Sequence, residues 1–227
     1  MGDNLLSLIL FTPLIGVLVL LFIPGTMKNA IRWWANISAV AGFLVSLPLI
    51  MNFDKSLDGY QFVERINWIP ALGVQYLVGV DGSSVLMVML TTFMGMLAIF
   101  SSWDSINDKV KEYYAMFLLQ QVGMIGVFVS LDFMLFYVFW ELVLVPMYFI
   151  IGVWGGPRKL YAAIKFFLYT LAGGVLMLLG IITLYLQHIA QTGVATFEIA
   201  QLMNTQMPLW MRSEERRVGK ECRSRWA

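Results

Sequence analysis

Six segments of about 20 mostly apolar residues dominate this 227-residue sequence. They lie at about residues 5–23, 33–51, 84–101, 113–130, 133–153 and 163–187. The hydrocarbon core of a bilayer is about 30 Å thick, and a helix of about 20 apolar residues spans it. The sequence therefore predicts an all-α fold, a polytopic transmembrane helix bundle with about six spans.

The composition excludes most other classes of protein. Hydrophobic residues make up 59% of the chain and charged residues 13%, whereas a soluble domain carries about 25% charged residues. Disorder needs the opposite composition, and a net charge of +1 gives no electrostatic reason to expect nucleic acid. One cysteine and one histidine cannot form a disulfide or a metal site. No nucleotide or metal-binding motif is present, so we expect no cofactor and no metal in this chain.

The last 16 residues differ from the rest of the chain. They carry a net charge of +3 and the single cysteine, Cys222. The stretch RSEERRVGKECRSRW, from Arg212 to Trp226, resembles the translation of a sequencing adapter. We expect residues 212–227 to be a non-native tail, residues 1–211 to form part of a transmembrane domain, and the natural product to continue differently. A native arm attracted to anionic lipid is the alternative.

Three further features concern local structure. The loop from Asn52 to Val80 is apolar but interrupted by Pro70, so we expect it to lie flat or to form short strands. The segment from Thr196 is expected to form a surface helix capped by Thr196. In the sixth span, Gly173-Gly174 and Gly180 are expected to make close helix contacts.

Basic residues predict the orientation in the membrane. The connections after the first, third and fifth spans hold Lys28, Arg32, Lys109, Lys111, Arg158, Lys159 and Lys165, against Lys55 and Arg65 on the other side. Because cytoplasmic loops are enriched in Lys and Arg, we expect the first set in the cytoplasm and the N-terminus outside.

Glu141 is the one acidic or basic residue well inside a predicted span. It lies nine residues after Asp132, which places it about 13 Å into the membrane, near the midplane. A charge there costs at least about 2.5 kcal/mol, so intramembrane acids are functional candidates. Pro146 removes a backbone hydrogen bond to the Leu142 carbonyl and loosens the next turn. A role for Glu141 in proton transfer is predicted; a glutamate that only joins helices is the alternative.

Lys165 is a weaker candidate, near the cytoplasmic start of the sixth span. It is predicted to take up protons from that side, although a lysine that snorkels to the membrane surface would look the same. His188 ends the same span and is expected to be structural. Asp81 and Asp132 have the positions of helix N-caps.

A resemblance to a known family rests on the block WELVLVPMY, from Trp140 to Tyr148. Around it lie SLDFMLFYVFWELVLVPMYFIIGVWGG and KFFLYTLAGGVLMLLG, and earlier in the chain FTPLIG, FIPG and GVDGSSVLMVMLTTF. In these motifs the chain resembles the N-terminal part of the antiporter-like membrane subunits of respiratory complex I (NADH:quinone oxidoreductase). The resemblance implies a truncated antiporter-like fold. It also implies that Glu141 is the fifth-helix glutamate, which in the family pairs with a lysine on the seventh helix; Lys165 is not that lysine.

The resemblance also implies a function and its setting. The chain would be a proton-translocating subunit that couples NADH oxidation and quinone reduction to proton transfer. Its partners would be the lipid bilayer and other membrane-arm subunits of complex I, with NADH, FMN, iron–sulfur clusters and quinone bound in partner subunits. The expected location is a bacterial inner (plasma) membrane. The alternatives are a subunit of a cation/proton antiporter complex or membrane-bound hydrogenase, a non-catalytic membrane scaffold, and a non-functional fragment.

Overall fold

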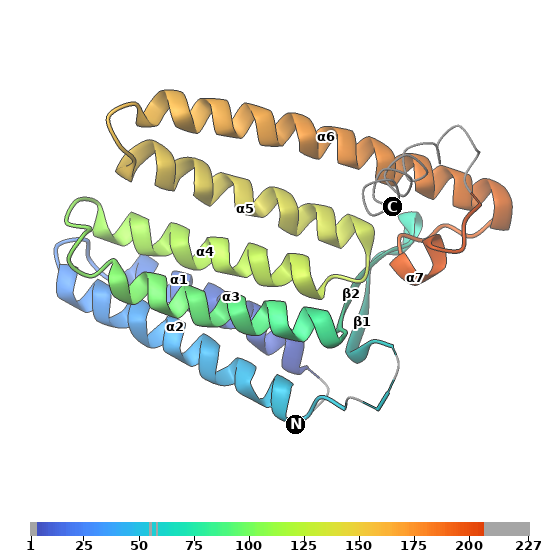
Figure 1. The fold of residues 1–227 in the computed structure, drawn as a ribbon, viewed down its shortest axis with the longest axis horizontal. Coiled ribbons are helices and arrows are strands. Elements are labelled where there is room, and N and C mark those ends of the chain that lie inside the picture. The colour runs from blue at the N-terminus through green and yellow to red at the C-terminus, as the bar shows by residue number, and fades with distance from the viewer. Residues whose placement is uncertain (1–3, 55, 58, 207–227) are drawn as a thin grey trace, which may run out of the picture.

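The computed structural model describes residues 4–54, 56–57 and 59–206. In this part of the chain six helices are long and apolar enough to span a bilayer. They are α1 (Leu5–Phe22), α2 (Lys28–Met51), α3 (Gly82–Ser101), α4 (Val110–Val129), α5 (Phe133–Trp154) and α6 (Lys159–Thr192). Figure 1 shows them running along the long axis of the molecule, which confirms the predicted all-α transmembrane bundle. The predicted tail at 212–227, with Cys222, lies outside the described residues.

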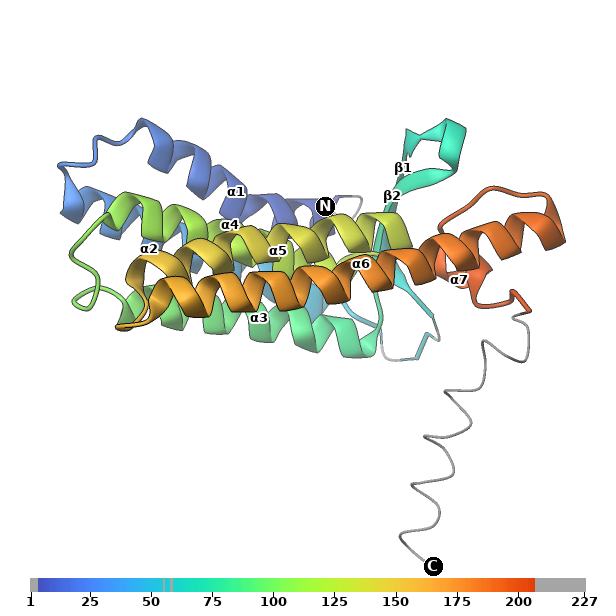
Figure 2. The same ribbon diagram turned by 90° about the horizontal axis from the view of Figure 1, so that it is seen from above.

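Three helices begin earlier than the apolar segments predict. α2 begins at Lys28, α4 at Val110 and α6 at Lys159, and α6 continues to Thr192. Hydropathy detects only the part of a helix that lies in hydrocarbon, whereas the backbone hydrogen bonds continue through the polar interface. The 34 residues of α6 measure about 51 Å, well beyond a 30 Å core. Its last turns project past the other helices in Figures 1 and 2.

The loop between α2 and α3 forms an antiparallel hairpin, so the predicted short strands are confirmed. β1 (Gln61–Ile69) pairs with β2 (Val74–Val80). A single 3-10 turn, η1 (Pro70–Leu72), joins them, followed by Gly73 at φ +70°. A Cβ at Gly73 would collide with the Ala195 backbone, so glycine is required there for space as well as conformation. The hairpin lies at one end of the bundle in both views (Figures 1 and 2).

Two hydrophobic clusters occupy the two ends of the bundle. The cluster near the hairpin includes Leu10, Val78 and Ile125, and the other includes Leu20, Ile99 and Tyr114. α4 contributes to both and contacts α1, α2, α3 and α5, so it is the central helix. α6 packs mainly on α5, and only 11% of its most apolar window is buried. Most of its surface therefore faces lipid or another protein chain.

Glycines set the close approach of α4 and α5. A Cβ at Gly126 would collide with the Phe139 ring, and a Cβ at Gly123 would lie 2.6 Å from Val143 Cγ2. Small residues at such positions allow two membrane helices to pack closely. This packing fixes the part of α5 on either side of Glu141.

Candidate functional site

The start of α5 is fixed by Asp132, as its N-cap position predicts. Asp132 Oδ1 accepts hydrogen bonds from the amides of Met134 (2.9 Å) and Leu135 (3.0 Å). Its other oxygen accepts one from the Gln75 amide of β2 at 3.2 Å, and the residue is fully buried. Since this cap ties α5 to the hairpin, the depth of every later residue of α5 is set from a fixed point. Glu141, nine residues on, lies about 13 Å along the helix.

The Glu141 carboxyl group faces α6. Its Oε1 atom is buried and has no hydrogen-bond partner among the described residues. The same atom lies against Gly174, so closely that a Cβ at Gly174 would overlap with it. Tyr137 lies one turn earlier on the same side of α5. A buried carboxyl oxygen without a partner is uncommon and asks for a functional or structural reason.

The described part of the chain offers Glu141 no cation. Its one ion pair joins Arg65 to Glu198, with Arg65 Nη2 and Glu198 Oε1 3.0 Å apart. A charged carboxylate inside a membrane is retained when it has a partner. Glu141 can therefore exist as a neutral acid, or as an anion when a cation from elsewhere approaches Oε1. A group with these two states can accept and release a proton.

Pro146 lies inside α5, five residues after Glu141. A proline has no amide hydrogen, so the carbonyl of Leu142 lacks its usual helical partner. On the other side of this turn, Phe139 is held against Gly126 of α4. Glu141 thus sits between a segment fixed to α4 and a turn with a free backbone acceptor.

Lys165 does not lie beside Glu141. Gly174, which faces Glu141, is nine residues further along α6, a separation of about 13 Å along the axis. The Lys165 side chain is exposed, and its Nζ lies 5.9 Å from the centre of the Tyr161 ring. The two predicted site residues are therefore separate features.

Two glutamines of α4 were missed by the sequence reasoning. Gln121 is 3% exposed, and neither of its amide atoms has a partner in the part of the chain that the structure describes; Gln120 Oε1 is also unpartnered there. Counted from the hairpin end of their helices, Gln121 and Glu141 lie equally deep, eight residues from Val129 and Phe133 respectively. The glutamines line a groove of about 180 Å³ between α3 and α4. Adjacent amides at the centre of an apolar span were the signal.

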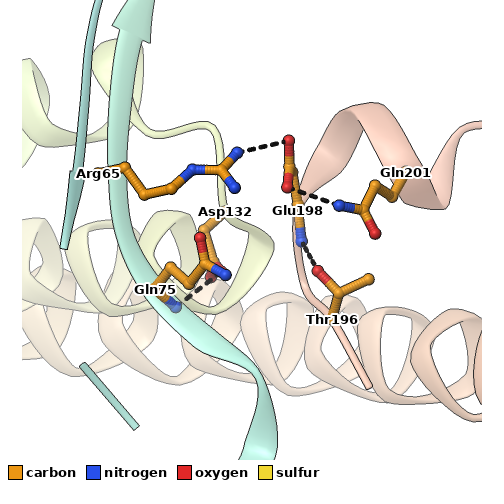
Figure 3. A network of polar contacts seen from close by, with 6 residues as sticks. All are labelled: Arg65, Gln75, Asp132, Thr196, Glu198 and Gln201. Carbon is orange, nitrogen blue, oxygen red and sulfur yellow. Dashed lines mark hydrogen bonds and ion pairs between the residues drawn. The ribbon is translucent and has the colours of Figure 1, made fainter. Parts of the chain in front are cut away.

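A polar network at the hairpin end surrounds Asp132 (Figure 3). Arg65 of β1 reaches Glu198, which in turn accepts a hydrogen bond from Gln201 at 2.8 Å. The segment at Glu198 also pairs with Asp132 as an isolated β-bridge. Burial raises the pKa of Asp132, and the Glu198 charge adds to this, whereas the three backbone amides bound to it act in the opposite direction. The network joins the hairpin to the starts of α5 and α7.

The helix predicted from Thr196 is shorter than expected. α7 (Ile199–Leu202) has only four residues, and its N-cap position is occupied by Glu198. Thr196 Oγ1 instead accepts a hydrogen bond from the Glu198 amide at 3.2 Å. The Ile199 amide donates to the carbonyl of Leu131, so pairing with the α4–α5 corner takes the place of a first helical turn.

The remaining candidates have structural roles. Asp81 is the N-cap of α3: its Oδ1 accepts a hydrogen bond from the Ser84 amide at 2.7 Å, which lowers the pKa of Asp81. His188 is buried, and its Nδ1 lies 2.8 Å from Thr205 Oγ1. Among the residues that the structure describes, no three His, Cys, Asp or Glu side chains could hold a metal ion together.

Comparisons with known proteins place these features in a family context. Residues 130–216 match the family described as "NADH:quinone oxidoreductase/Mrp antiporter, TM". NADH-quinone oxidoreductase subunit M of Rhodobacter capsulatus is 46% identical over 211 residues, which are 91% of this chain and 39% of that protein. F(420)H(2) dehydrogenase subunit M of Methanosarcina mazei is 39% identical over 197 residues, 87% of this chain and 39% of that protein.

The fold has also been seen before. A chain of respiratory complex I from Thermus thermophilus with bound NADH superposes with a TM-score of 0.73 and 24% identity. The match covers 89% of this chain and 40% of that one. The present chain thus spans about two fifths of the length of the proteins it matches.

Proposed function

We infer that this chain, which belongs to the NADH:quinone oxidoreductase/Mrp antiporter family of transmembrane proteins, is the N-terminal part of a proton-translocating membrane subunit. In this proposal the complete subunit belongs to an NADH:quinone oxidoreductase and couples NADH oxidation and quinone reduction to proton transfer. Glu141 is the proton-carrying residue of the part described. The relatives named after NADH-quinone oxidoreductase subunit M support this assignment.

One observation carries the proposal. The Oε1 atom of Glu141 is buried near the middle of a membrane helix, and nothing in the described chain binds it. An approaching cation stabilises the carboxylate, and its departure favours protonation. In this proposal a lysine on a later helix of the complete subunit is that cation. Movement of the lysine then changes the proton occupancy of Glu141.

The setting of the subunit follows the same proposal. The chain is an integral membrane protein with six candidate spans. We place it in a bacterial inner membrane beside other membrane-arm subunits, with NADH, FMN, iron–sulfur clusters and quinone bound in those partners. Basic residues gather where α1, α3 and α5 end, and three of them donate to loop carbonyls: Lys28 at 2.7 Å, Arg32 at 2.8 Å and Lys111 at 2.9 Å. This end is proposed to be cytoplasmic, with the N-terminus outside.

The test replaces Glu141 with glutamine in the full-length subunit of the assembled complex. Glutamine keeps the size of the side chain but cannot carry a proton at this position. We expect NADH-driven acidification of inverted membrane vesicles, followed with a fluorescent pH indicator, to fall at least about tenfold. NADH oxidation by an artificial acceptor at the flavin should be unchanged.

Glu112→Gln is the matched control, because Glu112 lies exposed in the first turn of α4. It should pump protons at the wild-type rate. If Glu141→Gln assembles normally and pumps like Glu112→Gln, the proposed role of Glu141 is wrong. That result would favour a membrane scaffold in which Glu141 only joins helices.

A second candidate is a subunit of a cation/proton antiporter complex, because the matching family includes Mrp antiporters. Vesicles can separate the two functions. Proton transport that needs NADH and a quinone supports the first, whereas sodium-driven proton movement without either substrate supports the second. The 46% identity to a subunit named for quinone oxidoreduction favours the first.

Lys165 is proposed, more weakly, to take up protons at the cytoplasmic surface. Its exposed position and its contact with Tyr161 agree with this role and with a snorkelling lysine alike. Lys165→Gln should slow vesicle acidification if it takes up protons, and should leave the rate unchanged if it only marks the interface.

A further inference from the structure

Gly174 occupies an unusual place in α6. It is one of four buried residues in that 34-residue helix, and its Cα side faces the Glu141 carboxyl group. A Cβ built at Gly174 would lie well inside 3.0 Å of Glu141 Oε1, a separation that real Cβ atoms essentially never show. The carboxyl oxygen therefore occupies the space that any other residue at 174 would fill.

The remaining surroundings of Gly174 do not require glycine. The carboxyl carbon of Glu141 lies 3.5 Å from the Cβ position, and the next atom, Trp140 Nε1, lies 3.9 Å away. Both distances are ordinary van der Waals contacts. An alanine methyl group would therefore fit between α5 and α6 if the Glu141 oxygen moved. Helix packing alone does not explain the glycine.

We propose that Gly174 is a positioning residue for Glu141: the absence of its side chain decides where the carboxyl group sits between α5 and α6. This inference rests on the proposed function of Glu141 in proton transfer. With glycine at 174, Oε1 lies in the space next to the α6 backbone. With alanine, the carboxyl end must retreat by about 1 Å to reach an ordinary contact distance.

The same arrangement recurs at two other helix pairs. The Gln121 amide lies over Gly95 of α3, with its Cδ and Nε2 both 2.9 Å from the Cβ position. Ser38 Oγ of α2 lies over Gly16 of α1. In each pair the polar group has a buried atom that is unpartnered among the described residues. Glycine on one helix thus makes space for a polar side chain of the next, and at Gly174 that side chain is the proposed proton carrier.

α6 supplies its own control residue. Gly173 precedes Gly174, and a Cβ at Gly173 meets no atom within 4 Å; the same holds at Gly180. The predicted close contact is therefore confirmed for Gly174, whereas Gly173 and Gly180 make none within the described chain. Gly173→Ala changes the same helix by the same methyl group without approaching Glu141.

The experiment compares Gly174→Ala with Gly173→Ala in the full-length subunit of the assembled complex. Infrared spectroscopy follows the carboxyl band that disappears in Glu141→Gln. We expect this band to shift in Gly174→Ala and to stay in place in Gly173→Ala. Misplacement of a reacting group by 1 Å can cost about 100-fold in rate, and a flexible carboxyl group recovers part of this, so vesicle acidification should fall about tenfold in Gly174→Ala.

Glu141→Asp gives a rescue test. Aspartate is one methylene shorter, so its carboxyl group does not reach the methyl group that the Gly174→Ala substitution introduces. The double variant Glu141→Asp, Gly174→Ala should pump no worse than Glu141→Asp alone, whereas two independent defects would multiply. Such non-additivity identifies two side chains that compete for one space.

The outcomes for the two proposals differ. If Gly174→Ala matches Gly173→Ala in both band position and pumping, the positioning role is wrong, whatever Glu141→Gln does. If the band shifts only in Gly174→Ala but Glu141→Gln pumps normally, the placement of the carboxyl group is right and the proposed proton transfer is wrong. A multiplicative loss in the double variant would also overturn the positioning role.

Discussion

The Glu64 carboxylate on β1 caps the first turn of α1 from a distance of 58 residues in the chain. Its Oε1 accepts a hydrogen bond from the Leu6 amide at 2.8 Å, and both oxygens are 3.2 Å from the Ser7 amide. The Ser7 hydroxyl also contacts Glu64 and lies 2.7 Å from the Tyr76 hydroxyl of β2. The first amides of a helix have no partners within it, and here the hairpin supplies one.

We expect Glu64→Ala to destabilise the protein by about 1–3 kcal/mol, because it leaves buried amide groups of α1 without an acceptor. Glu64→Gln should cost less, since the amide oxygen can still accept. Thermal unfolding of the purified protein in detergent measures the difference. Asn67→Ala, at an exposed position of the same strand, is the control. Equal unfolding temperatures for Glu64→Ala and Asn67→Ala would show that the cap contributes nothing.

Gly126→Ala should weaken the contact between α4 and α5 by about 1–3 kcal/mol, because overpacking displaces a well-packed side chain. The new methyl group would overlap with the root of the Phe139 ring, which a small rotation cannot avoid. Gly42→Ala is the matched control, since Gly42 lies in α2 with nothing within 4 Å of its Cβ position. Unfolding in detergent should separate the two variants; similar stabilities would contradict the packing assigned to Gly126.

Asp132 should make stability fall as the pH rises. Burial raises its pKa above the ordinary value of 3.8, so the folded state binds the proton more tightly than the unfolded state. This contribution is fully present below pH 3.8 and is lost as the pH passes through the folded pKa. Relative to Asp132→Asn, the wild type should therefore lose stability from about pH 4 upward and then level off.

Asp81 provides the opposite sign for the same measurement. The Ser84 amide lowers the pKa of Asp81 below 3.8, so its contribution is present above that pH and is lost at lower pH. Unfolding free energies of wild type, Asp132→Asn and Asp81→Asn, measured across the pH range, give two difference curves. Curves of the same slope would contradict the assigned surroundings of one aspartate.

Much of the fold could be predicted from the sequence, because each membrane span must satisfy its own backbone hydrogen bonds. The six apolar stretches therefore became six helices, with errors confined to their ends. The N-caps Asp81 and Asp132 were predictable for a similar reason, since a cap bonds amides two or three residues away. The short α7 was not, because the Ile199 amide pairs with Leu131, far away in the chain.

For the site, the sequence alone singled out Glu141, since a carboxyl group in hydrocarbon is costly wherever its helix is placed. The tertiary structure decided what that carboxyl group meets: Gly174 on α6, and no cation among the residues that the structure describes. It also separated Gly174 from the adjacent Gly173, which sequence cannot distinguish. The burial cost of a charge belongs to one residue, whereas the space around it depends on how two helices rotate against each other.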